Sequence, residues 1–159
     1  MIKKLKICEV TTTDPYNNLA LEEYMLENLV PGDMILYLWQ NAHTVVIGKN
    51  QNAWAECRVS LLEEEGGNLT RRLSGGGAVY HDLGNLNFTF ITMDEDYDLD
   101  KQFSVIAEAC KLAGISVEKS GRNDVLAEGR KFSGNAFYHH NGRSYHHGTL
   151  LIRVDMEKL

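Results

Sequence analysis

Two arginines directly before three glycines form the segment of the chain that is most suggestive of chemistry. Arg71 and Arg72 are followed, after Leu-Ser, by Gly75, Gly76 and Gly77. Glycine allows close approach of the backbone to a ligand and conformations with φ > 0, so that successive N–H groups converge on phosphate or carboxylate oxygens. Arginine adds planar pairs of donors. The segment predicts an anion-binding loop, and the alternative is a glycine-rich turn between strands.

The loop matches neither of the common nucleotide-binding patterns. Gly48 and Lys49 are followed by Asn50, and His43 stands where the first glycine of a P-loop would be. The dinucleotide fingerprint would need a glycine at the position of Tyr80. If this loop binds a nucleotide, it does so on another fold.

A carboxylate and a lysine form a second group of candidate residues further along the chain. Asp124 and Lys131 lie among glycines near the expected starts of strands. Asp124 alone is typical of a turn residue that caps its own backbone, and Lys131 alone is typical of a solvated strand lysine. The functional interpretation is that Lys131 supplies a mobile positive charge to the anion site, while Asp124 helps to hold a divalent cation at phosphates.

Four histidines flank the Asn-Gly pair at 141–142. A metal site is one interpretation, but neighbouring strand residues point to opposite faces, and no cysteine or acidic partner completes a ligand set. We therefore expect His139, His140 and His146 to be exposed near the turn and His147 to point inward.

Composition indicates one ordinary globular domain. The chain has 159 residues, of which 43% are hydrophobic and 24% charged. A net charge of −6 argues against a nucleic-acid-binding protein that neutralises phosphates. Three widely spaced cysteines without a CxxC pair are typical of a reduced, cytosolic protein. Without a signal peptide or an apolar run long enough to span a membrane, the expected location is the cytoplasm.

The elements that must position these residues can be outlined from periodicity. Asp14-Pro15 is expected to begin a helix that ends at Pro31-Gly32, with an apolar face made of Leu21, Met25 and Leu29. Two short strands, 34–39 and 44–47, are predicted to form a hairpin. A short helix near 57–65 and an extended segment 68–72 then lead into the glycine loop.

The second half is predicted to be richer in strands. The segment 85–93 alternates as a half-buried strand does, with residues 86, 88 and 90 on one face. A helix with an apolar stripe from Phe103 to Ala113 ends at Gly114, and a strand at 115–119 follows. Strands at 131–138 and 144–154 flank the Asn141-Gly142 hairpin turn. This order favours an α+β fold with a mixed, mainly antiparallel sheet flanked by helices.

Five motifs, in their order and spacing, resemble those of the lipoate–protein ligases. The resemblance covers essentially the whole chain and includes the opening helix. The motifs are the segment 71–82, Gly84-Asn85 with Phe88-Thr89-Phe90, Gly121-Arg122-Asn123-Asp124, Arg130-Lys131 with Ser133-Gly134, and His147-Gly148-Thr149-Leu150.

This resemblance implies the α+β catalytic domain shared by biotin and lipoate protein ligases, and a reaction in two steps. Lipoate attacks the α-phosphate of ATP, with Mg²⁺ as cofactor, to give lipoyl-AMP and pyrophosphate. The lipoyl group then passes to a specific lysine of a carrier: a lipoyl domain of a 2-oxoacid dehydrogenase, or the H protein of glycine cleavage. No nucleic acid or membrane partner is implied. A carboxylate is already an adequate nucleophile at neutral pH, so such a site needs positioning and charge neutralisation.

The resemblance also implies roles for individual residues. Lys131 matches the catalytic lysine that contacts the lipoyl carbonyl and the α-phosphate. Asn123 and Asp124 match the nucleotide side of the pocket, with Asp124 as the magnesium ligand. The remaining residues expected to bind the ligands are Arg72, Ser74, Gly75, Gly76, Gly77, Ala78, Val79, Tyr80, His81, Asn85 and His147.

Two other functions stay open at this point. Octanoyl transferases share the fold and the lysine but use a cysteine nucleophile and no ATP. The segment before Lys131 carries no cysteine, and Cys8, Cys57 and Cys110 lie elsewhere, which favours the ligase. The third possibility is a lipoyl-binding homologue or fragment without turnover.

The end of the chain also departs from the family's pattern. Members of the family continue well beyond the position of Leu159 and usually add a smaller C-terminal domain. We therefore expect residues 1–159 to be a catalytic domain that is truncated at its C-terminus, without the accessory domain, and that depends on a missing C-terminal part or a separate accessory subunit.

Overall fold

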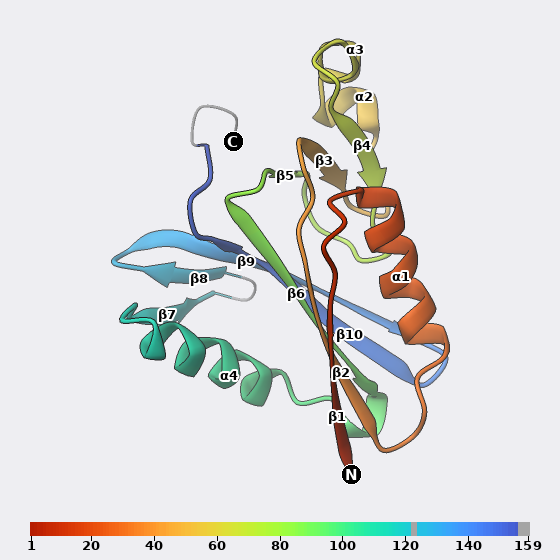
Figure 1. Ribbon diagram of the computed structural model, residues 1–159, viewed down its shortest axis with the longest axis vertical. Helices are drawn as coiled ribbons and strands as arrows, with labels where there is room; N and C mark the ends of the chain where they lie inside the picture. The colour runs from red at the N-terminus through yellow and green to blue at the C-terminus, as the bar shows by residue number, and fades with distance from the viewer. Residues whose placement is uncertain (122–123, 156–159) are drawn as a thin grey trace.

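The computed structural model describes residues 1–121 and 124–155. Within them the chain forms two sheets and several helices (Figure 1). The elements are β1 (Lys4–Glu9), α1 (Pro15–Glu27), β2 (Asp33–Trp39), β3 (Thr44–Ile47), α2 (Ala53–Glu56), α3 (Val59–Glu64), β4 (Asn68–Arg71), β5 (Val79–His81), β6 (Asn85–Met93), a 3₁₀ turn (Asp94–Asp96), α4 (Leu99–Leu112), β7 (Val117–Ser120), β8 (Asp124–Ala127), β9 (Arg130–His140) and β10 (Arg143–Leu151).

The larger sheet has seven strands in the order β1-β2-β6-β10-β9-β8-β7. Only the β1–β2 pair is parallel, and the other neighbours are antiparallel. The predicted α+β fold with a mixed, mainly antiparallel sheet is therefore confirmed.

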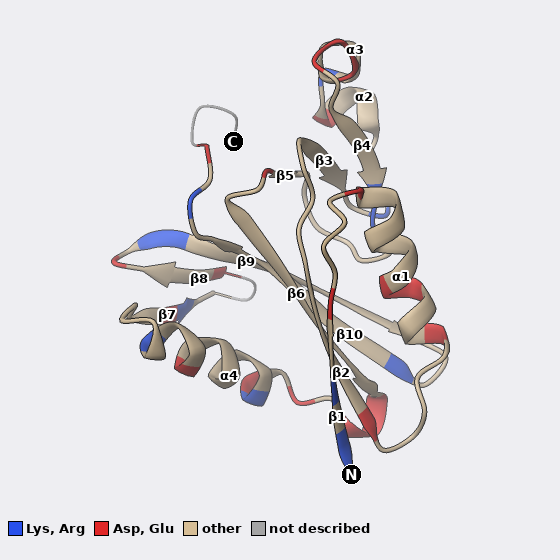
Figure 2. Cartoon of the chain, in the orientation of Figure 1, with Lys and Arg blue, Asp and Glu red and all other residues tan. Residues whose placement is uncertain are grey.

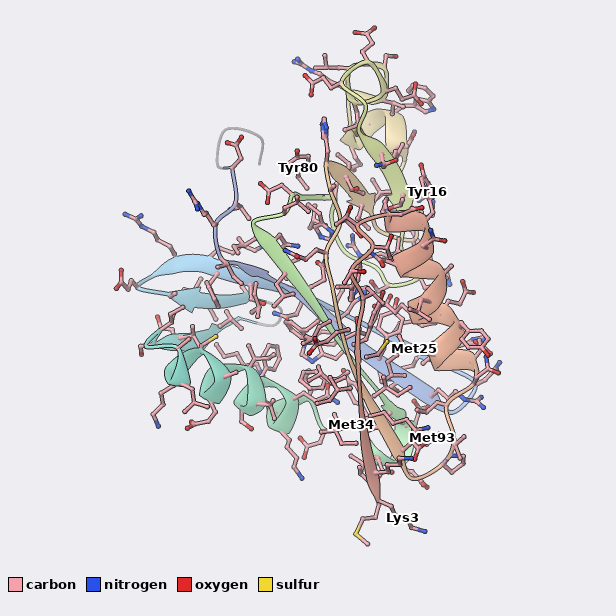
Figure 3. The ribbon with its side chains drawn as sticks, in the orientation of Figure 1. Lys3, Tyr16, Met25, Met34, Tyr80 and Met93 are labelled. Carbon is pink, nitrogen blue, oxygen red and sulfur yellow. The ribbon has the colours of Figure 1, made fainter. Side chains whose placement is uncertain are left out.

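Helices cover both faces of this sheet, α1 on one side and α4 on the other (Figure 1). Phe88 and Phe90 of β6 pack with Ile106 and Cys110 of α4. On the opposite face Ile91 packs with residues of α1, β2 and β10, and Met25 of α1 lies against this cluster, where Figure 3 labels it. The prediction that β6 is half-buried is wrong, because a central strand between two covered faces is buried on both.

The glycine loop belongs to a smaller sheet of three strands in the order β4-β3-β5. The predicted strand before the loop is β4, and the short strand after it, β5, was not predicted. The two strands flank β3, which pairs parallel with β4 and antiparallel with β5. The loop is therefore held at both ends by the same central strand.

The predicted hairpin of β2 and β3 is wrong, because the two strands lie in different sheets. The linker between them binds the start of α1 instead. The Asn18 side chain donates to the backbone oxygen of Gln40 at 2.8 Å, and the amide of Ala42 donates to the carbonyl of Thr13 at 3.1 Å. Alternation of side chains indicates that a strand exists but does not specify its partner.

Helix α1 begins where it was predicted to begin, but its buried face is shifted. The Asp14 carboxylate caps the helix by accepting from the amides of Tyr16 and Asn17. The buried side chains are Pro15, Asn18, Glu22 and Leu26, while the predicted Leu21 and Met25 are only half-buried. Two polar residues thus lie on the face that packs on the sheet, and one of them reaches the functional site.

The predictions for the apolar stripe of α4 and for the turn between β9 and β10 are confirmed in most respects. The stripe on α4 buries Phe103, Ile106 and Cys110, although Ala113 is exposed. Strands β9 and β10 pair across a turn in which Asn141 and Gly142 have φ of 50° and 76°. In the part of the chain that the structure describes, no helix is both long and apolar enough to cross a membrane.

Candidate functional site

A cavity of about 230 Å³ lies between the glycine loop, β9 and the α1-facing side of the larger sheet. It receives side chains from elements that are far apart in the sequence. Its lining comprises Leu19, Trp39, Val46, Arg72, Gly76, Gly77, Ala78, Val79, His81, Asn87, Asp124, Lys131, Gly134, Asn135, Ala136, His147, Gly148 and Thr149. Most of the predicted site residues are therefore in one place.

Lys131 and Asp124 form an ion pair at the more exposed end of the cavity. Their strands β8 and β9 are antiparallel neighbours with a bulge between Val125 and Leu126. The Lys131 Nζ lies 3.0 Å from the Asp124 Oδ1, and both side chains are about half-exposed. Gly134 lies beside the lysine, since a Cβ at this position would be in van der Waals contact with Nζ at 3.5 Å. The pair can therefore meet a ligand from the solvent side.

Arg72 is buried beneath the glycine loop and shapes it. Its Nη2 donates to the carbonyls of Gly75 at 2.8 Å and Gly77 at 2.7 Å, while Nη1 donates to Val46 at 3.1 Å. Desolvation lowers the pKa of the guanidinium, but arginine stays charged near neutral pH. Although Arg72 lines the cavity, its donors mainly fix carbonyl oxygens, which leaves the loop amides to face a ligand.

Arg71 lies outside the cavity lining and serves the neighbouring loop. Its Nη1 donates to the carbonyls of Gly48, Lys49 and Gln51, at 3.0, 3.1 and 2.7 Å. Gly48 packs so closely on Gly76 that a Cβ there would overlap the Gly76 carbonyl. The two arginines that suggested an anion cradle thus act largely as cross-links of the backbone.

A chain of buried hydrogen bonds joins this loop to β10 and α1. The Ser74 Oγ lies 2.8 Å from His147 Nε2, and His147 Nδ1 lies 2.9 Å from Glu22 Oε1. Glu22 also accepts from the Thr89 hydroxyl at 2.6 Å. The Ser74 Oγ also accepts from Arg72 Nε at 3.1 Å. The network fixes the loop against the sheet.

Glu22 was missed in the sequence, and the reason is the shifted face of α1. A glutamate is rarely buried without a partner, and its partner His147 is 125 residues away. Two signals were present: Asn18, Glu22 and Leu26 follow one another at four-residue spacing, and Glu22 belongs to the opening helix that resembles the ligase family.

The predicted inward orientation of His147 holds, but the prediction that His146 is exposed is wrong. His146 faces α4 and is fully buried between Gln102 and Asn135, at 3.1 and 2.9 Å from their side-chain oxygens. Burial lowers its pKa to about 3, so the ring is neutral. His139 and His140 are exposed, as predicted. Both faces of β10 are covered by helices, which the alternation of histidines could not reveal.

The other predicted residues take different places. Ser74, Gly75, Tyr80 and Asn85 are not part of the lining. Tyr80 lies on β5, where Figure 3 labels it, with its ring against His43. Buried Asn85 donates to the side-chain oxygen of Asn87 at 2.9 Å, so it contacts a residue of the cavity lining and not the cavity itself. Asn123 lies outside the described residues.

Charge and polarity differ between the two ends of the cavity. Figure 2 shows basic residues at the start of β9, where the exposed end with Lys131 and Asp124 lies. The apolar part of the lining includes buried Trp39 and Val46 and half-buried Leu19. Within residues 1–121 and 124–155, no group of three or more His, Cys, Asp or Glu side chains is placed to hold a metal ion. A lining that combines an ion pair with apolar side chains suits a molecule with an anionic head and an apolar tail.

Comparison with known proteins agrees with this geometry. Residues 14–159 match the family described as "Lipoyl protein ligase A/B catalytic domain". The chain is 48% identical over 156 residues to the lipoate-protein ligase A of Psychrobacter cryohalolentis, covering 98% of this chain and 46% of the relative. It is 46% identical to that of Bdellovibrio bacteriovorus, covering 99% and 48%. The chain thus spans slightly less than half the length of these relatives.

Solved structures show the same similarity. LipL1 of P. falciparum in complex with lipoate superposes with a TM-score of 0.90 at 34% identity, covering 96% of this chain and 50% of that one. A lipoate-protein ligase A bound with ATP superposes with a TM-score of 0.87 at 28% identity, covering 100% of this chain and 70% of that one.

Proposed function

Because the chain belongs to the lipoyl protein ligase A/B catalytic domain family, we propose that it activates lipoate with ATP and transfers the lipoyl group to a lysine of a carrier domain. The observation that carries the proposal is the single cavity in which the glycine loop, Lys131 and Asp124 surround one end and apolar side chains surround the other. Similar structures contain bound lipoate and bound ATP.

In the first step, a carboxylate oxygen of lipoate forms a bond to the α-phosphorus of ATP, and the bond to pyrophosphate breaks. Negative charge moves to the phosphoryl oxygens in this step. Lys131 stabilises this charge, because its flexible ammonium can leave Asp124 and bind the acyl and phosphate oxygens. The amides of Gly76 to Ala78 line the cavity and are donors to the same oxygens.

In the second step, the neutral amine of the carrier lysine attacks the acyl carbon, AMP leaves with the electron pair of the acyl–oxygen bond, and the nitrogen loses one proton to water to give the amide. No side-chain nucleophile is needed, since the mixed anhydride is already activated. The chain contributes positioning of the two reactants and stabilisation of negative charge.

The residues present suit a magnesium ion at the nucleotide side. Mg²⁺ is commonly held by one or two carboxylates together with substrate phosphates, and Asp124 places one carboxylate on the cavity wall. The ion would neutralise phosphate charge there.

As carriers we propose lipoyl domains of 2-oxoacid dehydrogenases and the H protein of glycine cleavage. One similar structure pairs an archaeal bi-partite lipoate protein ligase with its E2 lipoyl domain. The cytoplasmic location expected from the sequence stays a prediction.

The transferase alternative is not favoured by the placement of the cysteines. Among the residues that line the cavity there is no cysteine, and Cys110 lies on the buried face of α4, packed against Phe88 and Phe90. A thioester mechanism through a cysteine would need one of them at the acyl carbon.

The test is release of pyrophosphate from ATP and lipoate by the purified protein. We expect lipoate-dependent release by the wild type and loss of at least about a hundredfold in Lys131→Ala, because a charge-stabilising group contributes on this scale. Lys6→Ala is the matched control, since Lys6 pairs with Asp33 on the edge strand β1, at the opposite edge of the larger sheet from β8 and β9. Acyl transfer without ATP would instead support the transferase, and binding of lipoate without either reaction would support a binding protein.

A further inference from the structure

The exposed end of the cavity holds a carboxylate and an ammonium in direct contact. Lys131 Nζ lies 3.0 Å from Asp124 Oδ1, and the two side chains are 58% and 44% exposed. Among the lining residues that the structure describes, Asp124 is the one acid, and Arg72 is buried and bonded to loop carbonyls. A molecule that enters from solvent therefore meets two opposite charges side by side.

A bulge in β9 creates this contact. Asp124 is paired with Gly134 and Leu126 with Lys131, so a step of two residues on β8 matches a step of three on β9. Strict alternation would put Lys131 and Gly134 on opposite faces of β9, and the extra residue turns Lys131 to the side of Asp124. The ion pair is thus built into the pairing of the two strands.

The second step of the proposed function, on which this inference rests, separates charge at the reacting carbon. The lone pair of the neutral carrier amine forms the carbon–nitrogen bond, and an electron pair of the carbonyl moves to its oxygen. The tetrahedral intermediate carries a negative oxygen and a positive nitrogen on the same carbon. Water then takes one proton from the nitrogen, and AMP leaves with the electron pair of its bond to the carbon. With Lys131 at the oxygen, the positive nitrogen lies beside a second positive charge, which is unfavourable without a counter-charge.

We propose that Asp124 stabilises the attacking nitrogen of the carrier lysine while Lys131 stabilises the acyl oxygen. The carboxylate is open to this role in the second step, because Lys131 has moved to the acyl and phosphate oxygens and pyrophosphate has left. Its partial exposure gives access to a side chain that arrives from a carrier. Asp124 acts as a fixed negative charge and does not take the proton, so the ion pair matches the two charges of the intermediate.

The experiment starts from preformed lipoyl-AMP, with EDTA and without ATP, so that neither the first step nor a metal ion contributes. Transfer to an E2 lipoyl domain is followed in a single turnover. In Asp124→Asn the rate constant should fall about tenfold to a hundredfold, since a half-exposed charge contributes less than a buried one. The dissociation constant of lipoyl-AMP should stay within about twofold, because the nitrogen is charged only during the reaction. Asp124→Glu, which restores the charge, should recover most of the rate.

Two small acceptors distinguish a role at the nitrogen from an indirect effect through Lys131. Ethanolamine attacks as an amine and develops a positive nitrogen, whereas 2-mercaptoethanol attacks as a thiolate and forms no cationic atom. After subtraction of the rates without protein, Asp124→Asn should be slower than the wild type with ethanolamine. With 2-mercaptoethanol it should be equal or faster, because the negative nucleophile no longer meets a carboxylate.

Glu118→Gln is the matched control. It makes the same change of charge on β7, the strand next to β8, at an exposed position outside the cavity lining. Its rates with all three acceptors should equal those of the wild type.

Three results would overturn this inference while lipoate-dependent release of pyrophosphate stands: unchanged transfer in Asp124→Asn, a parallel loss with both small acceptors, or no acceleration of ethanolamine by the wild type. Absence of transfer to the lipoyl domain by the wild type would contradict the second step of the proposed function, and the inference with it.

Discussion

Glu22 offers the sharpest test of how the glycine loop is held in place. Its carboxylate accepts two buried hydrogen bonds, from Thr89 at 2.6 Å and from His147 at 2.9 Å, and its side chain is 3% exposed. Substitution by alanine removes the acceptor from both donors at once. Each unsatisfied buried donor costs about 1–3 kcal/mol, so Glu22→Ala should lower the free energy of unfolding by roughly 2–6 kcal/mol.

Glutamine keeps the shape and a carbonyl oxygen in the same place. Glu22→Gln loses only the difference between a charged and a neutral hydrogen bond, about 1 kcal/mol. The free energies are measured by urea unfolding followed by circular dichroism. Glu23→Ala, at an exposed position of the same helix, should stay within about 0.5 kcal/mol of the wild type.

The loop itself provides a second readout. Because His147 connects Glu22 to Ser74, loss of the carboxylate should release the loop, and amide hydrogen exchange at Lys49, whose N–H donates to the Ser74 carbonyl at 2.9 Å, should become faster in Glu22→Ala than in Glu22→Gln. If the two variants had equal stability and equal exchange, the carboxylate would not be the acceptor that holds this network, and the reasoning would be refuted.

Two further predictions concern packing and pH. Gly48→Ala should lower the free energy of unfolding by about 1–3 kcal/mol in urea unfolding, because the added methyl overlaps the Gly76 carbonyl, whereas Gly75→Ala meets no atom within 4 Å and should change little. His146 is held neutral with its pKa lowered to about 3, so the unfolded state binds more protons between about pH 6.5 and 3. Stability should therefore be complete above that window and fall as the pH drops through it, with a smaller slope in His146→Gln; an unchanged slope would contradict a neutral, buried His146.

Much of the local structure could be predicted because it depends on neighbours in the sequence. The cap at Asp14 satisfies amides two and three residues away. The Asn141-Gly142 turn needs two residues that tolerate positive φ, and these two provide it. The glycine loop was correctly placed after a strand, and the resemblance to the ligases assigned the loop and Lys131 to one site.

The errors share a different cause, since each involves a partner that is distant in the sequence. Strand β3 pairs with β4 and β5 rather than with β2, and nothing in its four residues specifies that choice. His146 is buried because α4 covers the second face of β10, which alternation on the strand itself cannot show. The role of Arg72 was also open, since only the folded loop brings carbonyl oxygens to its guanidinium.

The sequence by itself therefore determined the fold class, the family and the residues that gather at the cavity. It could do so because motif residues and turn signals are local and keep their spacing in the chain. Only the tertiary structure decided that Glu22 supports the loop through His147, across 125 residues, and that His146 is buried against α4. Burial and hydrogen-bond satisfaction are properties of the assembled fold, because they depend on which distant segments exclude water from a side chain.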